Sequence, residues 1–281
     1  MIFLIILPLL FTAILGNSTN EYIYANIALP DGRIIGGHPV DIEDYPYQVS
    51  VQILSCHYCG GAIISDRYIL SAAHCYSGWK ALLPYTVRAG SRYRYEGGQV
   101  VSVMKISTHP NYNKTAPTDS DISILRIAPS LTFGSGVAPI SLAEQNQAFA
   151  DGTWAAPISL PEQNQAFADG TWAVVSGWGY VNEDGSILNQ LQAVWVPIVD
   201  NTRCESLYKV LNQKVTKSMV CAGYINGGKD ACKGDSGGPL VANGLLFGIV
   251  SWGVGCAAPR APGVYASVPY FRSYIKEITG I

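Results

Sequence analysis

The stretch Gly234-Asp235-Ser236-Gly237-Gly238-Pro239 places a serine among glycines, where a polypeptide backbone can approach a side chain closely. Taken alone, Gly-x-Ser-x-Gly is also the nucleophile elbow of α/β hydrolases, or an ordinary glycine-rich turn. Two upstream segments bear on the choice, Ser71-Ala72-Ala73-His74-Cys75 and Asp119-Ser120-Asp121-Ile122. The chain therefore holds a serine, a histidine and an aspartate, each in a distinctive local setting.

A serine hydroxyl is a weak nucleophile until a histidine takes its proton, and that histidine needs a carboxylate to fix its tautomer and orientation. His74, Asp121 and Ser236 supply this set in the chain order His, Asp, Ser. The α/β hydrolases have the order Ser, acid, His, so the elbow interpretation is disfavoured. Asp119 is interpreted as a solvated loop residue. The remaining histidines, interpreted as surface or turn residues, are His38, His57 and His109.

Several further motifs follow one another along the chain. They are Ile34-Ile35-Gly36-Gly37, Cys59-Gly60-Gly61, Ser176-Gly177-Trp178-Gly179, Cys221-Ala222-Gly223 and Ser251-Trp252-Gly253. With the histidine and serine motifs, they make residues 34–281 resemble a chymotrypsin-fold serine protease, and specifically a trypsin, most like an invertebrate one. The resemblance implies an all-β fold of two six-stranded antiparallel barrels, with the active site in the cleft between them.

The resemblance also implies a role for each catalytic residue. His74 is expected to act as general base and then acid, Asp121 to orient it, and Ser236 to attack the peptide carbonyl. The backbone N–H groups of Gly234 and Ser236 would form the oxyanion hole. The segment Ser251-Trp252-Gly253 would pair with the substrate backbone as an added strand.

Substrate specificity is expected from the same resemblance, which places Asp230 at the base of the primary pocket and Gly253 and Gly263 at its walls. Because a buried, unpaired carboxylate is costly, a Lys or Arg side chain should fill this pocket best. Ala231 stands where many trypsins carry a serine that helps hold the Lys ammonium. We therefore expect a preference for Arg, which pairs bidentately with a carboxylate. Lys233, in place of the usual glutamine at the pocket rim, predicts tolerance of acidic residues near the cleaved bond.

The N-terminal segment predicts export and activation. The apolar run Ile2 to Leu15 is too short to span a bilayer and is typical of a signal-peptide core, although it lacks a preceding Lys or Arg. A buried strand or an anchor is the alternative. We expect a signal peptide over 1–16 and a propeptide over 17–33. Arg33-Ile34 resembles a zymogen cleavage site, after which the new α-amino group of Ile34 would pair with Asp235.

The cysteines fit an oxidising compartment, and their odd number, 7, leaves one without an internal partner. The resemblance pairs Cys59 with Cys75, Cys204 with Cys221 and Cys232 with Cys256, and leaves Cys56 over. The two positions of a further disulfide common in trypsins are occupied by Ala173 and Ala242. Asn17 and Asn113 begin glycosylation sequons, which lend only weak support to secretion.

Composition argues against several ligands. With 18 Lys and Arg against 20 Asp and Glu, the net charge of -2 offers no basic excess for nucleic acid. A zinc site at Cys56-His57-Tyr58-Cys59 is disfavoured because no matching ligands occur elsewhere. The segment Gly90 to Gly98, where vertebrate trypsins place an acidic calcium loop, has one acid and two arginines. We therefore expect no metal, no calcium dependence and no other cofactor.

Periodicity predicts short strands and one helix. Alternating or apolar runs predict strands at Tyr47 to Ile53, Val100 to Ile106, Ile122 to Ile127, Leu191 to Val199 and Leu245 to Ser251. The alternation over Tyr47 to Ile53 is typical of a half-buried strand. Apolar residues three or four apart predict a C-terminal amphipathic helix, and they are Val268, Phe271, Tyr274, Ile275 and Ile278.

A tandem duplication interrupts the family pattern. Residues 138–155 read APISLAEQNQAFADGTWA and residues 156–173 repeat them, differing only at Ala143 against Pro161. Two copies do not make a solenoid, so we interpret 138–173 as a duplication within one connection, either a real insertion or a sequence artefact.

The leading hypothesis is a secreted zymogen of a trypsin-like endopeptidase, with a digestive role, that cuts after Arg and Lys. We expect a monomer that acts on protein and peptide substrates, with protein protease inhibitors as candidate partners and no nucleic-acid or membrane partner. Two alternatives remain. One is a regulatory cascade protease of narrower specificity, and the other is a catalytically inactive homologue that acts as a binding module.

Overall fold

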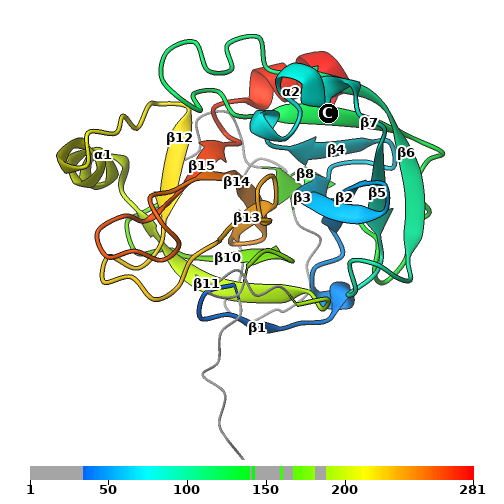
Figure 1. The fold of residues 1–281 in the computed structure, drawn as a ribbon, viewed down its shortest axis with the longest axis horizontal. Coiled ribbons are helices and arrows are strands. Elements are labelled where there is room, and N and C mark those ends of the chain that lie inside the picture. The colour runs from blue at the N-terminus through cyan, green and yellow to red at the C-terminus, as the bar shows by residue number, and fades with distance from the viewer. Residues whose placement is uncertain (1–33, 140, 143–158, 161–166, 181–187) are drawn as a thin grey trace, which may run out of the picture. The chain divides into compact units, whose positions relative to one another are not determined.

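The computed structural model describes residues 34–139, 141–142, 159–160, 167–180 and 188–281 (Figure 1). The predicted signal peptide, the whole of the predicted propeptide and much of the duplication lie outside these residues. None of the helices in the described ranges is long and apolar enough to cross a bilayer.

The first barrel is a closed antiparallel sheet of six strands in the order β2-β3-β4-β7-β6-β5. Its strands are β2 (Gln48–Ile53), β3 (Cys56–Ile63), β4 (Tyr68–Ser71), β5 (Tyr85–Ala89), β6 (Gln99–Thr108) and β7 (Ser123–Ala128). Pairing of β2 with β5 closes the ring, with Val51 opposite Val87. Inward-facing aliphatic side chains such as Val49, Ile69 and Leu125 are fully buried and fill the interior.

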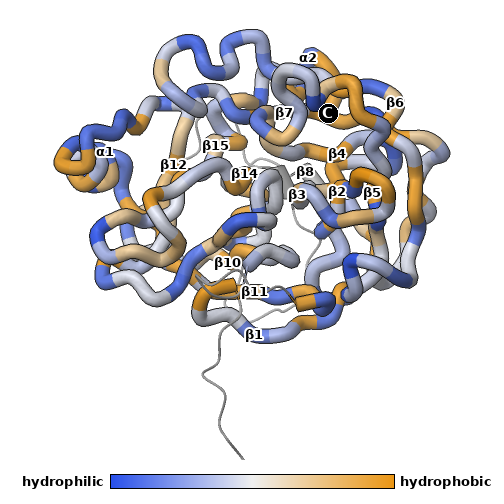
Figure 2. Tube along the Cα trace, in the orientation of Figure 1, coloured by the Kyte–Doolittle hydropathy of each residue, from blue (hydrophilic) through white to orange (hydrophobic). Residues whose placement is uncertain are grey.

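The second barrel also closes with six antiparallel strands, because β13 pairs with both β10 and β14. Its strands are β10 (Trp172–Gly177), β11 (Gln192–Val199), β12 (Met219–Ala222), β13 (Pro239–Ala242), β14 (Leu245–Trp252) and β15 (Gly263–Ser267). The expected two-barrel, all-β fold is confirmed. In Figure 2 apolar residues recur along the barrel strands, and hydrophilic residues gather in the connecting loops.

Short elements complete the fold. They are β1 (His38–Pro39), which pairs with β11, three 3-10 turns η1 (Ile42–Asp44), η2 (Ala73–Cys75) and η3 (Gly78–Leu82), and two α-helices, α1 (Asn201–Val210) and α2 (Arg272–Thr279). The side chain of Asp200 caps α1 by accepting hydrogen bonds from the N–H groups of Thr202 and Arg203. Helix α2 is the predicted C-terminal helix, and its Ile275 is fully buried.

Strand β2 differs from its prediction as half-buried, because its polar side chains are buried as well as its apolar ones. Gln48, Ser50 and Gln52 are each 0% exposed. The Oε1 atom of Gln48 accepts a hydrogen bond of 2.7 Å from the hydroxyl of Ser176 in the second barrel. Gln48 therefore links β2 to the other barrel, while the hydroxyl of Ser50 bonds to His57 and Nε2 of Gln52 donates to the carbonyl of Arg94.

The duplication leaves its mark on the second sheet. Strand β8 (Ser141–Leu142) belongs to the first copy and β9 (Ser159–Leu160) is the equivalent dipeptide of the second copy. The two pair in parallel and in register, and Ser159 pairs with Leu245 of β14. Strand β9 of the second copy therefore lies next to β14, and the last two residues of that copy, Trp172 and Ala173, belong to β10. Strand β8 is the outermost strand of the described sheet.

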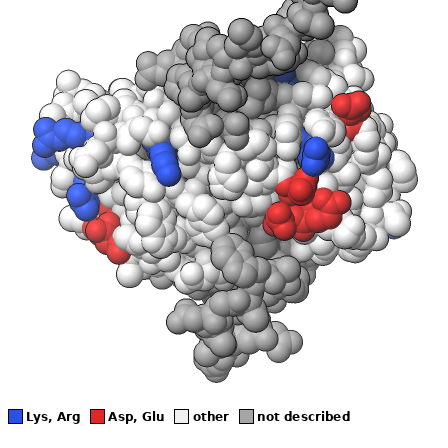
Figure 3. Space-filling model, turned by 90° about the horizontal axis from the view of Figure 1, so that it is seen from below, with Lys and Arg blue, Asp and Glu red and all other residues white. Residues whose placement is uncertain are grey.

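Among the described residues visible in Figure 3, charged side chains are few and most of the surface is neither acidic nor basic. This agrees with a charged fraction of 14% for the chain.

Candidate active site

The structure brings together the predicted histidine and aspartate on the first barrel. His74 lies in η2 just after β4, and Asp121 lies two residues before β7. Nδ1 of His74 is 2.7 Å from Oδ2 of Asp121, and the backbone N–H of His74 donates to Oδ1 at 2.8 Å. The hydroxyl of Ser251 donates to the same Oδ2 at 2.5 Å. Because a buried carboxylate accepts only, Asp121 holds the proton of His74 on Nδ1 and leaves Nε2 free to act as a base.

Ser236 comes from the second barrel, in the turn before β13, and a contact between glycines brings it to the first. Its carbonyl accepts a hydrogen bond of 2.7 Å from the N–H of Gly60. A Cβ added to Gly60 would lie 2.9 Å from Cα of Gly238, so the two glycine motifs pack directly against each other. The described contacts hold no hydrogen bond between the Ser236 hydroxyl and His74, a bond that in such sites often tightens only with substrate bound.

The predicted oxyanion hole has a supporting residue that the sequence did not indicate. Gly234 has φ +97°, a conformation that disfavours any side chain. Its carbonyl accepts a hydrogen bond of 2.9 Å from Nε2 of His57, while Nδ1 of His57 is 2.8 Å from the hydroxyl of Ser50. Burial lowers the pKa of His57 to about 4, so the ring is neutral at pH 7. The prediction of His57 as a surface or turn residue is wrong, because it ties β2 and β3 to the serine turn.

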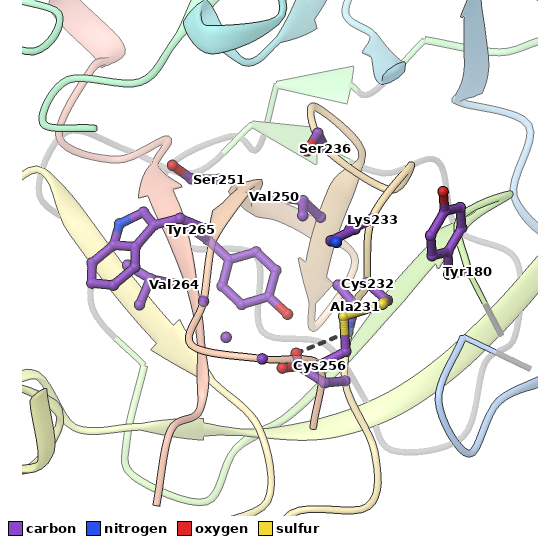
Figure 4. Close-up of a pocket in the computed structure, with 15 residues that line it drawn as sticks. Tyr180, Ala231, Cys232, Lys233, Ser236, Val250, Ser251, Cys256, Val264 and Tyr265 are labelled. Carbon is purple, nitrogen blue, oxygen red and sulfur yellow. Dashed lines mark hydrogen bonds between the residues drawn. A yellow bond between two sulfur atoms is a disulfide. The ribbon is translucent and has the colours of Figure 1, made fainter. Parts of the chain in front are cut away.

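A pocket of about 420 Å³ opens beside Ser236. In Figure 4 Ser236 lies at one end of this pocket, and Ala231 with the Cys232–Cys256 disulfide lies at the other. Asp230 is 4% exposed and accepts hydrogen bonds from the N–H groups of Ala231, at 2.8 Å, and Ala257, at 3.3 Å. Burial raises its pKa to about 7, because the ionised form loses its hydration. The pocket therefore ends in a carboxyl group that makes no ion pair with any cationic side chain of the described residues.

The walls of this pocket require small residues. A Cβ added to Gly263 would lie 2.6 Å from Oδ1 of Asp230 and 3.0 Å from the hydroxyl of Tyr265. A Cβ on Gly253 would meet nothing closer than 3.7 Å, so it would extend into open space and narrow the pocket. The buried Tyr265 hydroxyl has no partner among the described residues and belongs to a side chain that lines the pocket (Figure 4). A long side chain with polar hydrogens at its tip fits this shape and chemistry.

The predicted substrate strand is the end of β14. Trp252 pairs with Val264 of β15 on one edge, while the described strands leave the other edge of Ser251–Trp252 open beside the Ser236 turn. The ring of Trp252 packs against Tyr208 of α1 at 4.9 Å. Tyr208 was not predicted as a site residue. Its position four residues after the buried Cys204, on the same helix face, is the signal that could have found it.

Asp235 is fully buried behind the serine turn. It accepts hydrogen bonds from the N–H groups of Gly179, at 2.8 Å, and Cys232, at 3.0 Å. Burial raises its pKa to about 6. Ile34 is also fully buried, in the apolar cluster of the second barrel, whereas Arg33 lies outside the described residues. The predicted pairing of Asp235 with a new α-amino group at Ile34 stays a prediction.

Asp119 departs from its prediction as a solvated loop residue, because it is only 5% exposed. Its Oδ1 accepts hydrogen bonds from the hydroxyls of Thr216, at 2.5 Å, and Ser218, at 2.6 Å. Burial disfavours the charged form, but these hydrogen bonds outweigh it and hold the pKa of Asp119 below its ordinary value. An ionised carboxylate thus joins a loop of the first barrel to a loop of the second.

The cysteines form the three pairs that the resemblance implies, Cys59–Cys75, Cys204–Cys221 and Cys232–Cys256, and Cys56 is free and exposed. Ala173 and Ala242 face each other in register across β10 and β13. Within the described ranges, one group of candidate metal ligands gathers, Cys59, His74 and Cys75. Because its two cysteines form a disulfide, they offer no thiolate to a metal.

Two closed antiparallel barrels with a histidine–aspartate pair on one and a serine in a glycine turn on the other define a chymotrypsin-like serine endopeptidase. The family model described as trypsin matches residues 34–156 and 152–275, two segments that overlap where the duplicated copies meet. Curated relatives agree.

The chain is 38% identical to Trypsin 5G1 of Aedes aegypti, over 100% of this chain and 99% of that protein. It is 41% identical to Trypsin beta of Drosophila erecta, over 87% of this chain and 88% of that protein. It is 39% identical to the Vitellin-degrading protease of Bombyx mori, over 88% of this chain and 86% of that protein. The chain therefore belongs to the trypsin family and is a trypsin-like serine endopeptidase.

Proposed function

We propose that this chain is the secreted zymogen of a digestive endopeptidase that cleaves after Arg and Lys, with Arg preferred. Residues 1–16 would be its signal peptide, 17–33 its propeptide and 34–281 the peptidase domain. Cleavage at Arg33 would free the α-amino group of Ile34 to pair with Asp235 and order the pocket. Because Arg is the residue that this enzyme should itself recognise, the proposal includes autoactivation.

The proposed mechanism uses His74, Asp121 and Ser236. Nε2 of His74 takes the proton of the Ser236 hydroxyl as its oxygen attacks the peptide carbonyl, and then gives that proton to the leaving amine. Asp121 stabilises the imidazolium through the 2.7 Å contact with Nδ1. The N–H groups of Gly234 and Ser236 bind the oxyanion, and removing one such donor costs about 10²- to 10³-fold in rate in related sites. Water then hydrolyses the acyl-enzyme by the same steps.

The observation that carries the specificity is Asp230, buried at the end of the pocket that starts at Ser236. A guanidinium supplies the missing cation and enough N–H donors for both Asp230 oxygens and for polar neighbours. A Lys side chain is shorter than an Arg side chain, and Ala231 has no hydroxyl group to accept a hydrogen bond from its ammonium group. Lys233 lines the same pocket and lies between Ser236 and Cys232 in Figure 4, which supports tolerance of acidic residues close to the cleaved bond.

The test compares chromogenic Arg, Lys and Phe anilides of one design, before and after controlled cleavage at Arg33, with Ser236→Ala as the blank. We expect activity only after cleavage, none with Phe, and about tenfold higher kcat/KM for Arg than for Lys, the factor for about 1.4 kcal/mol. Ala231→Ser should narrow the ratio of Arg to Lys. Correctly processed protein that cleaves none of the three would favour the inactive binding homologue.

A narrower, regulatory role is the second candidate, and one relative, the Vitellin-degrading protease, is named for a single kind of substrate. A panel of unrelated folded and unfolded proteins separates the two roles. Cleavage of most members at Arg and Lys supports digestion, whereas cleavage of one or two at a single bond supports a cascade protease.

A further inference from the structure

A second hollow, of about 570 Å³, lies outside the specificity pocket. One wall is the loop that leads to Asp121 and contributes Thr115 and Asp119, and the other is the segment 213–218 that follows α1. Three lysines line it, Lys209, Lys214 and Lys217. All three are exposed, and none forms an ion pair with another described residue.

The acidic residues of this hollow leave its lysines available. Asp119 lies in the lining, but its carboxylate is buried and accepts hydrogen bonds from Thr216 and Ser218. It therefore fastens the two walls together. Glu205, the other acidic residue of the lining, is exposed on α1 and makes no ion pair with Lys209, one turn away. Three ammonium groups thus face solvent on a wall that buried hydrogen bonds hold in place.

Both walls of the hollow continue into the active site. Asp121 follows Asp119 by two residues on the first barrel. On the second barrel, Lys209 directly follows Tyr208, whose ring packs on Trp252 at 4.9 Å and whose hydroxyl donates to the carbonyl of Pro262 at 2.6 Å. Trp252 also lines the specificity pocket. This hollow, called the lysine hollow below, is therefore linked to the pocket that holds Asp230 through the contact between Tyr208 and Trp252.

The direction of the substrate decides which of its residues reach this hollow. A strand added to the open edge of Ser251–Gly253 runs antiparallel to it, with its reacting residue at Ser236 and earlier residues toward Gly253. Residues before the cleaved bond consequently pass Trp252. At about 3.3 Å per residue, the fourth to sixth residues before the cleaved bond lie about 10–17 Å from the reacting one, beyond Trp252 and toward Lys209.

We propose that the lysine hollow is an extended substrate site for Asp and Glu side chains at the fourth to sixth positions before the cleaved bond, counting the cleaved Arg or Lys as the first. This inference rests on the proposed function, whose open strand edge supplies the direction of the substrate. Exposed ion pairs are individually weak, so three lysines together should raise kcat/KM about tenfold for an acidic substrate. The gain should appear in KM and fade as salt screens the charges.

The test uses two internally quenched peptides with one Arg each, identical except for three Asp or three Asn at the fourth to sixth positions before the cleaved bond, with the Arg as the first. At these positions the acidic residues are at least three residues from the Arg that enters the pocket, so they are separated from Lys233, which lines that pocket. We expect the activated enzyme to cleave the Asp peptide with about tenfold higher kcat/KM than the Asn peptide at 20 mM salt. At 0.5 M salt the two kcat/KM values should be about equal. The variant Lys209→Gln/Lys214→Gln/Lys217→Gln should lose this preference through KM, with kcat unchanged.

A matched control removes three exposed charges elsewhere, Lys105→Gln, Arg126→Gln and Lys276→Gln, and should keep the preference. Equal losses in both triple variants would overturn the proposal in favour of a general field effect, as would no loss in either. A third result would also overturn the proposal: a sulfated polysaccharide binds through the three lysines, but the triple lysine variant keeps its preference for the Asp peptide.

A short Arg anilide has no residues that reach the lysine hollow, so its cleavage tests the proposed protease function separately from the lysine site. All variants should cleave it equally. Failure of the unmodified enzyme to cleave it would remove the proposed function itself, whereas its cleavage without any Asp preference would remove only the lysine site.

Discussion

Asp230 and Asp235 lie five residues apart, and both carboxyl groups are buried without a cation among the described residues. Asp230 faces the specificity pocket, whereas Asp235 faces the backbone N–H groups of Gly179 and Cys232. Burial raises their pKa values to about 7 and about 6. Because burial without a cation disfavours the ionised form of each carboxyl group, a cation that binds later would stabilise that form. This cation would be the substrate side chain for Asp230 and the α-amino group of Ile34 for Asp235.

Cation binding to the pocket should therefore depend on pH through Asp230. Below pH 7 the empty pocket holds a neutral acid, so a bound amidinium must first displace its proton. Affinity should rise about tenfold per pH unit below 7 and level off above it, as expected for a single linked proton. Calorimetry of benzamidine binding to the Ser236→Ala protein between pH 5 and 9 measures this.

Asp230→Asn is the matched variant, since it keeps the shape of the side chain and removes the titration. This variant should bind benzamidine weakly, and its affinity should not rise between pH 5 and 7. A wild-type profile that is flat over this range would show that Asp230 is already ionised in the empty pocket.

At the scale of single elements, the loop before β7 and the loop after α1 are joined by the Asp119 carboxylate. Ser120 has φ 58°, an uncommon conformation for a non-glycine residue, and its N–H donates to the hydroxyl of Ser218 at 3.3 Å. The next residue is Asp121. The junction therefore holds a strained backbone directly beside the proposed catalytic aspartate.

Removing this junction should lower the stability of the protein. Asp119→Ala leaves the hydroxyls of Thr216 and Ser218 without their charged acceptor. Hydrogen bonds to charged groups are worth about 1.5–3 kcal/mol each, so the loss of two predicts a decrease of about 3–6 kcal/mol in unfolding free energy. Urea unfolding measures the loss. Asp119→Asn, which keeps an acceptor oxygen, should lose less.

Asp44→Ala serves as the control, because Asp44 is exposed and its side chain makes no described hydrogen bond or ion pair. It should stay within about 0.5 kcal/mol of the unmodified protein. An Asp119→Ala protein as stable as this control would refute the role of the junction.

The strands were predictable where the pattern was local. The runs at Val100 to Ile106 and Leu191 to Val199 match β6 and β11 to within two residues at each end, because alternation of apolar side chains needs no distant partner. His57 and Asp119 were assigned wrongly because their partners are distant, 177 residues away for His57 with Gly234 and 97 for Asp119 with Thr216. Only the resemblance, not periodicity, indicated how the two barrels meet.

At the scale of the whole molecule, the segment that vertebrate trypsins use for calcium is closed here by its own contacts. The hydroxyl of Ser91 donates to the carbonyl of Glu96 at 2.5 Å, and Arg92 forms an ion pair with Asp41. Arg94 is only 8% exposed, and its carbonyl accepts a hydrogen bond from Gln52. Positive side chains therefore stand where a calcium site needs carboxylates.

Calcium should not change thermal stability. A site with Kd of about 10⁻⁴ M would add about 2 kcal/mol at 5 mM calcium, which corresponds to a rise of about 5 °C in Tm. We expect instead the same Tm, by differential scanning fluorimetry, in 5 mM calcium, in 5 mM magnesium and in a chelator. A rise specific to calcium would contradict the prediction.

The duplication raises the question of how much of its 36 residues the fold needs. The two copies differ only at Ala143 and Pro161, and both end in Trp-Ala, the pair that in the second copy starts β10. Deleting residues 138–155 or residues 156–173 therefore leaves the same sequence in front of Val174, apart from one Ala or Pro. Either deletion still supplies one Ser-Leu dipeptide to pair with Leu245 of β14, and every strand of both barrels.

Both deletions should fold and should match the full-length enzyme in kcat/KM on an Arg anilide. Halving a connection changes its closure free energy by only about 0.6 kcal/mol, which corresponds to about 1–3 °C in Tm for a chain of this size. The pair of deletions is its own control, because any difference between them reports the Ala-to-Pro change alone. If both deletions abolish folding, the second Ser-Leu strand, β8, is a necessary part of the sheet; if only the full-length chain is inactive, the extra copy is what disables it.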